Sequence, residues 1–194
     1  MRLGLQDAGE LLTLQRAAYV TQARLHDDLD LPVLVEPLER VRARLADPAV
    51  TTIGLRLRGT GRLVGSVHLA VHLPDGTADG TADDTADGTA EVGRLSVAPD
   101  LQGAGLGTRL LALAEAAVPA GVHRIRLFTG EHSAANLRLY GRLGYARTHR
   151  TPAPAGYDLV HLAKDLPTPA PAPTAAHVTR RPGTDRGTTR TVGT

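Results

Sequence analysis

Three glycines follow a short apolar segment and stand directly before a stretch with helical periodicity. They are Gly103, Gly105 and Gly107. Glycine lets the backbone turn sharply and approach a ligand with no Cβ in the way, so several N–H groups can converge on one phosphate. The N-terminus of the following helix adds positive character. The backbone from Gln102 to Thr108 is therefore predicted to bind an anion such as a phosphate.

A second candidate group lies further along the chain, where Asn136 and Tyr140 are four residues apart. In a helix this spacing places both side chains on one face. Ser133 is a candidate N-cap that fixes where this face points. The alternative, in which Tyr140 is only a residue of an amphipathic core, stays open. Tyr145 is expected to be structural and to pack after Gly144, which would end the helix.

These motifs resemble those of the GNAT family of acyl-CoA-dependent N-acetyltransferases. The family signature is Gln/Arg-x-x-Gly-x-Gly/Ala between a strand and a helix, and Gln102, Gly105 and Gly107 fill it. Asn136-Leu-Arg-Leu-Tyr140, followed by Leu143-Gly144-Tyr145, is similar to the family's Asn-x-x-x-Tyr helix and Gly-aromatic turn. Two independent motifs in the right order make coincidence improbable.

The resemblance implies that acetyl-CoA is the acyl donor and that an amine attacks its thioester directly in a ternary complex. It places the pyrophosphate of coenzyme A on the glycine turn and the pantetheine beside the preceding strand, where the Val97 N–H would polarise the thioester carbonyl. It also implies that Asn136 binds the cofactor arm and that Tyr140 protonates the departing thiolate. The cofactor-binding residues implied in this way are Leu95, Ser96, Val97, Gln102, Gly103, Ala104, Gly105, Leu106, Gly107, Thr108 and Asn136.

The general base is predicted to be Glu91, which stands eleven positions before Gln102. Some members of the family carry their catalytic carboxylate at this place. A half-buried carboxylate beside the acceptor amine can have a raised pKa and act directly or through water. Glu91 as a merely solvated side chain is the alternative, and Glu131, His132 and water are the next candidates for the base.

Hydrophobic periodicity predicts the elements that position these groups. Asp7 to Glu10 has the pattern of a capping box at the start of a first helix. Strands are expected at 1–5, 51–58, 62–73, 91–97, 124–128, 145–149 and 157–163, and helices from residue 7, at 37–46, after the glycine turn and at 133–143. The order β-α-α-β-β-β-α-β-α-β-β is that of the GNAT fold, an α/β class with a mixed sheet and helices on both faces.

The chain is predicted to form one domain, residues 1–166, with two segments that cannot pack. Residues 75–90 are a tandem Asp-Gly-Thr-Ala repeat with no apolar side chain larger than alanine, which predicts a disordered loop between two strands. The Pro, Thr, Ala and Arg of residues 167–194 predict a disordered tail. The family resemblance covers residues 1–166 and is strongest at 91–145.

The composition excludes several kinds of functional site. The 194 residues are 42% hydrophobic and 22% charged, with a formal net charge of +2, which is ordinary for a globular domain. The lack of cysteine excludes disulfides, thiolate metal sites and a cysteine nucleophile. His68 and His72 share one face of a strand, but without a third ligand they predict solvent-facing or pocket-lining side chains and no metal. With no recognisable leader or apolar span, we expect a cytoplasmic protein that binds neither membrane nor nucleic acid.

Other functions fit less well. A dinucleotide-binding turn would need an acid near position 127, which is Leu127, and a P-loop would need a Lys after the glycines. The serious alternative is a non-catalytic acyl-CoA-binding regulatory module. The acidic stretch from His26 to Asp30, together with Glu36, favours a cationic small-molecule or peptide amine as acceptor, with a merely solvated loop as the equal alternative. The oligomeric state stays open, with a homodimer among the options.

Overall fold

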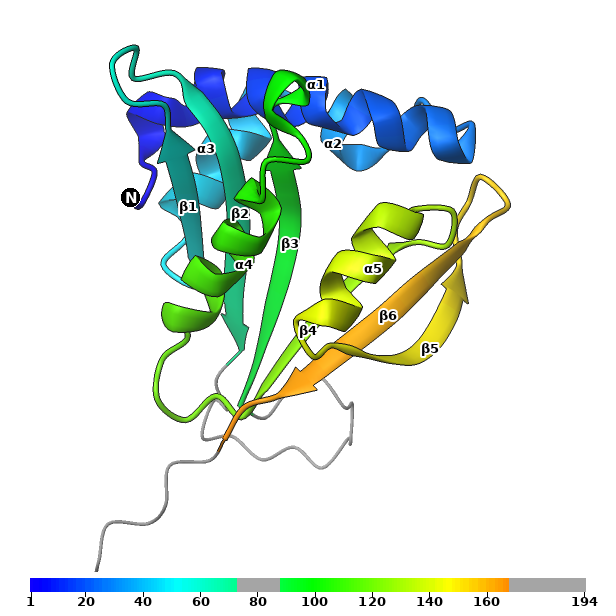
Figure 1. Cartoon of the computed structure of the whole chain (residues 1–194). Helices are drawn as coiled ribbons and strands as arrows, with labels where there is room; N and C mark the ends of the chain where they lie inside the picture. Colours follow the sequence, from blue (N-terminus) through cyan, green and yellow to red (C-terminus); the bar gives the residue numbers. More distant parts are fainter. Residues whose placement is uncertain (73–87, 168–194) are drawn as a thin grey trace, which may run out of the picture.

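The computed structural model describes residues 1–72 and 88–167, which build a six-stranded mixed sheet (Figure 1). The strand order is β1-β2-β3-β4-β6-β5. Strands β3 and β4 run parallel, and the other neighbouring pairs are antiparallel. The strands are β1 (Val50–Arg56), β2 (Leu63–His72), β3 (Thr89–Val97), β4 (Arg124–Gly130), β5 (Ala146–Pro152) and β6 (Asp158–Asp165).

Helices cover both faces of this sheet. Helices α1 (Ala8–His26), α2 (Pro32–Val35) and α3 (Leu38–Ala46) lie on one side, and α4 (Leu106–Ala116) and α5 (Ala134–Arg142) lie on the other (Figure 1). Short 3₁₀ turns precede α1 and α4. The layered arrangement confirms the predicted mixed α/β fold, and the short helix α2 is an element that periodicity did not predict, because one turn is too short to show a period.

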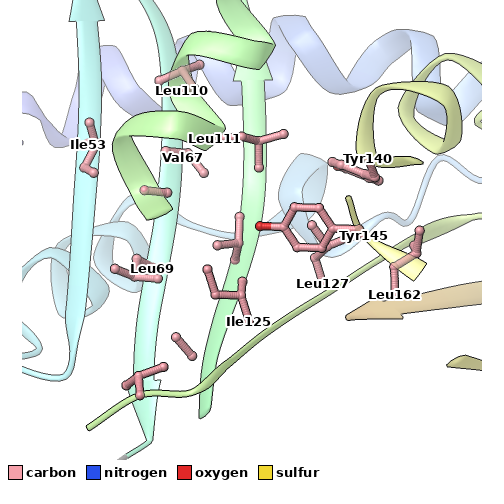
Figure 2. Packing of buried hydrophobic residues seen from close by; sticks show 14 of the residues in the cluster. Ile53, Val67, Leu69, Leu110, Leu111, Ile125, Leu127, Tyr140, Tyr145 and Leu162 are labelled. Carbon is pink, nitrogen blue, oxygen red and sulfur yellow. The ribbon is translucent and has the colours of Figure 1, made fainter. Parts of the chain in front are cut away.

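Two apolar cores hold the helices to the sheet. The larger one lies between the sheet and α4 and α5, and its central side chains are almost completely buried (Figure 2). Its best buried members are Val67, Leu69, Leu110, Leu111, Ile125 and Leu162. The smaller one joins α1 and α3 to β2 through Leu11, Leu14, Val41, Leu63 and Val64. Because alternate residues of β2 face opposite cores, this strand is buried on both faces.

The first strand is shorter than predicted. Instead of a strand at residues 1–5, the chain forms one antiparallel bridge between Arg2 and Ile53. The Leu3 N–H donates to the Thr52 carbonyl at 2.8 Å, and the Gly54 N–H donates to Met1 at 2.9 Å. The chain then turns into α1 at once, which leaves no room for a longer strand.

The expected capping box at Asp7 and Glu10 is wrong. Neither carboxylate binds the first N–H groups of α1. Asp7 accepts instead from the Gly4 N–H at 2.8 Å, and Glu10 accepts from the Leu63 N–H at 2.7 Å. Both acids also bind Arg56, each at 2.6 Å. These long-range partners tie α1 to the β1–β2 hairpin, and a local sequence pattern cannot reveal them.

The repeat between β2 and β3 ends earlier than predicted. Its last two residues, Thr89 and Ala90, belong to β3 and are buried, with exposed fractions of 4% and 1%. They pair with Arg124 and Ile125 of β4, which accounts for their burial. Residues 75–87 of the repeat and the tail at 168–194 lie outside the described residues. Within the described ranges no helix is both long and apolar enough to cross a membrane.

Candidate active site

The glycine turn joins β3 to α4. Gly103 and Gly105 have φ angles of +82° and +78°, in the left-handed region that favours glycine. Gly105 is the N-cap of α4, so the N–H groups of Leu106, Gly107 and Thr108 have no acceptor within the helix. A Cβ added at Gly103 or Gly105 would meet open space. The turn therefore presents several N–H groups and a helix N-terminus to an open region, which is the geometry expected of an anion site.

Gly107 has a different role from the one predicted. It lies inside α4 and not in the left-handed region, so it does not form the turn. A Cβ added there would lie 3.3 Å from Cδ2 of Leu139 in α5. Gly107 therefore allows α4 and α5 to pack closely beside the site.

Strands β3 and β4 pair at one end and separate toward the other. Their pairing runs from Thr89 opposite Arg124 to Glu91 opposite Arg126 and then stops. Beyond it the two strands diverge toward the glycine turn and α1 (Figure 1). In the described part of the chain, no strand pairs with the edge of β3 that faces this opening.

Val97 lies at the open edge of β3. The next residue, Ala98, donates its N–H to the Val64 carbonyl of β2 at 2.9 Å. Because N–H groups alternate in direction along a strand, the Val97 N–H points away from β2 and into the opening. The Val97 carbonyl accepts from Nε2 of Gln102 at 3.3 Å, so the signature glutamine braces the end of the strand.

Helix α5 flanks the other side of the opening. Nδ2 of Asn136 donates to Oγ1 of Thr129, the next-to-last residue of β4, at 3.3 Å. Ser133 is the N-cap of α5, as predicted, but its hydroxyl donates to Oε1 of Gln22 in α1 and makes no cap hydrogen bond. Tyr145 is buried and follows Gly144, whose φ is +88°, which confirms that it is a packing residue.

A pocket of about 460 Å³ fills the opening between the two strands. The predicted site residues that line it are Leu95, Val97, Gln102, Gly103, Gly105, Leu106, Gly107, Thr108, Asn136 and Tyr140. Three predicted residues are not among its lining: Ser96, Ala104 and Glu91. Ser96 is buried, and its hydroxyl donates to the Arg94 carbonyl at 3.0 Å.

Tyr140 and Tyr19 both line this pocket. Burial raises the pKa of Tyr140 above its ordinary value, and the nearby Tyr19 adds to this effect. Burial likewise raises the pKa of Tyr19 to about 12, with Arg94 acting in the opposite direction. Both phenols are therefore neutral proton donors at neutral pH. Tyr19 was not predicted, because its place beside the core face of α1 gives no signal in the sequence.

Arg94 is a second pocket residue that the sequence did not reveal. It lies at a β-bulge, where the β2–β3 register shifts between Ser66 and His68. Its φ is +50°, so a non-glycine residue occupies a left-handed position in the middle of a strand. Burial lowers the pKa of Arg94, and Arg44 nearby acts in the same direction.

Glu36 does not make the pocket acidic. Both of its oxygens accept from Nη2 of Arg44, at 2.8 and 2.9 Å, and one of them also accepts from Nη1 of Arg94. Nη2 of Arg16 donates to its backbone carbonyl at 2.9 Å. The carboxylate is therefore paired and buried, and the reason for expecting a cationic acceptor is lost at this position.

His26, the last residue of α1, also lines the pocket. Its Nδ1–H donates to the Gln22 carbonyl at 2.9 Å, which leaves Nε2 as the nitrogen with the lone pair. Nε2 is buried without a hydrogen-bond partner among the described residues. The ring packs against Tyr157, with centroids 4.3 Å apart. This unpartnered nitrogen therefore belongs to one of the side chains that line the pocket.

The candidates for the base lie outside the pocket lining. Glu91 is exposed at the start of β3, two residues before Gly93, and shares its side of the strand. Glu131 accepts from the Asp158 N–H at 2.9 Å and pairs with Arg150 at 3.0 Å. His132 is exposed. Of these three, Glu91 is the one on the strand that forms the pocket wall.

His68 is neither solvent-facing nor pocket-lining, contrary to the prediction. It is 4% exposed, with Nε2 3.0 Å from Nε2 of Gln15 and Nδ1 3.2 Å from Oγ1 of Thr52. The alternation of side chains along β2 shows which residues share a face, but it does not show how completely α1 covers that face. In the described part of the chain no group of three His, Cys, Asp or Glu side chains is placed to hold a metal ion.

A protein-family model also matches this chain. The acetyltransferase (GNAT) family model matches residues 17–145, more than half of the chain. None of the curated proteins matches the sequence significantly.

Solved structures share the fold at low sequence identity. The ribosomal-protein-S18-alanine N-acetyltransferase of Escherichia coli is 18% identical, with a TM-score of 0.61 over 85% of this chain and 91% of its own. The ribosomal-protein-alanine N-acetyltransferase of Brucella melitensis is 20% identical, with a TM-score of 0.63 over 86% and 98%. An acetyltransferase of Thermus thermophilus is 20% identical, with a TM-score of 0.59 over 85% and 94%. With the family model, the splayed strands and the glycine turn in agreement, the chain belongs to the GNAT family of acetyltransferases.

Proposed function

We propose that this protein transfers an acetyl group from acetyl-CoA to a primary amine by direct attack in a ternary complex. The observation that supports this most strongly is one pocket lined by the glycine turn, the open edge of β3, Asn136 and Tyr140. Such a reaction needs a positioned thioester, a polarised carbonyl and a proton for the leaving thiolate. The pocket has a candidate for each of these tasks.

The donor is positioned by backbone groups more than by side chains. The N–H groups at the start of α4 bind the pyrophosphate, and Gly103 and Gly105 let it approach the backbone. The pantetheine lies along the open edge of β3, where it takes the place of the missing strand and pairs with backbone groups that β4 does not reach. The Val97 N–H donates to the thioester carbonyl as it gains negative charge. Asn136, fixed by Thr129, binds the pantetheine arm.

Tyr140 supplies the proton to the thiolate. Its raised pKa keeps the phenol protonated at neutral pH, so that the O–H can donate to the sulfur as the C–S bond breaks and negative charge develops there. Its place on α5, beside Asn136, brings the hydroxyl to the same pocket as the donor arm.

Glu91 serves as the base through water. The side chain is too far along β3 to line the pocket, but it is on the face of the strand that Gly93 and Arg94 share. A carboxylate here removes the ammonium proton through intervening water, so that the neutral amine attacks. The acceptor itself is a small-molecule or peptide amine, and nothing in the pairing of Glu36 favours a second positive charge on it.

A panel of amines with acetyl-CoA, monitored by release of free thiol, tests the function. Amine-dependent release with a matching N-acetylated product supports transfer. The alternative is the non-catalytic acyl-CoA-binding module. It predicts that acetyl-CoA binds in calorimetry while no amine in the panel raises thiol release above the hydrolysis background.

A further inference from the structure

The backbone at Arg94 is unusual for the residue that occupies it. Arg94 and Leu95 together lie opposite Val67, which makes Arg94 the extra residue of a bulge in β3. A left-handed first residue in such a bulge is normally glycine. An arginine kept at a φ of +50° is disfavoured, and positions of this kind persist where the side chain has a task.

The Arg94 side chain leads into a region with excess positive charge. Two guanidinium groups, those of Arg44 and Arg94, bind the single carboxylate of Glu36, and Arg16 donates to the Glu36 backbone carbonyl close by. Arg44 alone already binds both carboxylate oxygens, so the charge of Glu36 is compensated without Arg94. Arg44 and Arg94 together carry one positive charge more than the shared carboxylate of Glu36 balances, and Arg94 lines the pocket.

The guanidinium of Arg94 also has free donors. Its hydrogen bond to Glu36 uses Nη1, and no described residue accepts from Nε or Nη2. The side chain is 22% exposed and lines the pocket. The two free nitrogens match the two oxygens of a carboxylate, which arginine binds bidentately.

We propose that the acceptor is an amine that carries a carboxylate, and that Arg94 binds this carboxylate. The proposal rests on the proposed acyl transfer and names its substrate class. Glu36 and Arg44 belong to the α2–α3 side of the sheet, so Arg94 faces the side opposite α4 and α5. The phosphates of coenzyme A would lie at the start of α4, on that other side, and so do not supply the anion. Because Arg94 precedes Val97 by three residues, the carboxylate would be held near the reacting carbonyl.

The experiment compares matched amines that differ only in this group. Free amino acids and their carboxamides are assayed with the wild type, Arg94→Gly and Arg94→Lys. Glycine suits the left-handed backbone, so Arg94→Gly removes the guanidinium and keeps the bulge. We expect the wild type to prefer the acid in kcat/KM and expect Arg94→Gly to reduce the acid-to-amide ratio by roughly ten- to a hundred-fold. Arg94→Lys, which keeps the charge but not the bidentate fork, should retain part of the ratio. Arg58→Gly, at an exposed position of the β1–β2 turn, is the control that should keep the ratio.

A second measurement needs no turnover. N-acetyl amino acids, the products of the proposed reaction, are titrated into the coenzyme A complex of wild type and Arg94→Gly by calorimetry. If the N-acetyl amino acids bind to Arg94→Gly more weakly than to the wild type, by a factor similar to the change in the acid-to-amide ratio, the carboxylate site is supported. This holds even if no amine is acetylated; the proposed function then fails, but the inferred carboxylate site does not. If amines are acetylated but acids and amides react equally well, or if Arg94→Gly lowers both by the same factor, the inference is wrong.

Discussion

At the scale of single residues, Tyr140 offers the most direct test of the chemistry. Tyr140→Phe removes the proton donor but keeps the ring that packs in the core (Figure 2). We expect kcat to fall by roughly ten- to a thousand-fold while acetyl-CoA binding changes little. Tyr145→Phe is the matched control, because this tyrosine is equally buried and does not line the pocket. Equal rates for Tyr140→Phe and the wild type, with chemistry rate-limiting, would assign the proton to water or to another residue.

The role of Glu91 as the base is tested by the pH dependence of the rate. Glu91→Gln should lower the rate most at low pH and be partly rescued as the pH rises, because solution then supplies the neutral amine. The pH dependence of kcat/KM for the best amine in the panel measures this. Glu131→Gln, whose carboxylate pairs with Arg150 outside the pocket lining, should leave the profile unchanged. If Glu131→Gln changes the pH dependence of kcat/KM and Glu91→Gln does not, Glu131 is the base and Glu91 is not.

His26 and Gly130 are coupled by a close approach. A Cβ added at Gly130 would lie 2.0 Å from Nε2 of His26. Gly130 does not have a positive φ, so the cost of alanine there is steric. We expect Gly130→Ala to destabilise the protein by about 1–3 kcal/mol in urea unfolding, since the imidazole must move. Combination with His26→Ala should recover part of this loss, and purely additive effects of the two substitutions would contradict the coupling.

At the scale of elements, the start of α4 tests the donor site. Gly105→Val forces a β-branched residue into the left-handed region and places its side chain where the pyrophosphate approaches. We expect acetyl-CoA binding to weaken strongly in calorimetry. Gly59→Val, in the β1–β2 turn, has a φ of +90° and the same open surroundings, so it carries a similar backbone strain far from the site. If both variants bind acetyl-CoA as the wild type does, the glycine turn is not the phosphate site.

The elements also differ in how far the sequence could predict them. The glycine turn, α4 and α5 were predictable, because left-handed glycines, helical spacing and a terminal Gly144 are local signals. The bulge in β3 was not, since Arg94 stands where the left-handed backbone would suggest glycine. Local patterns also missed the distant side-chain partners of Asp7 and of Ser133, although Ser133 is the predicted N-cap residue. The bulge changes which residues of β3 face α4, and it lies just beyond the point where β3 and β4 stop pairing.

At the scale of the whole molecule, the order of elements was enough to predict the fold, because alternating and helical periods record which face of each element is buried. Depth of burial depends on what covers that face. The alternation of β2 indicates that His68 and His72 share one face, but the depth of His68 follows from Gln15 of α1 and Thr52 of β1 on either side of its ring. The same limit applies to Glu36, which reads as an acidic loop residue and is buried between arginines of α3 and β3.

The depth of His68 makes the stability of the whole domain dependent on pH. Burial lowers the pKa of His68 to about 3, and Arg44 and Arg94 add to this. In the unfolded chain a histidine titrates near its ordinary value of about 6.5. Between these two values the unfolded state binds a proton that the folded state does not, so the free energy of unfolding falls as the pH falls through this window.

We therefore expect the wild type to lose about 2 kcal/mol of stability between pH 7 and pH 5 through this one group, measured by urea unfolding. His68→Gln should remove this part of the pH dependence, whatever its effect on stability at pH 7. His72→Gln, at the exposed end of the same strand, should keep it. The same loss in His68→Gln as in the wild type would mean that other groups carry the acid sensitivity and that His68 is already protonated, with a partner, in the folded protein.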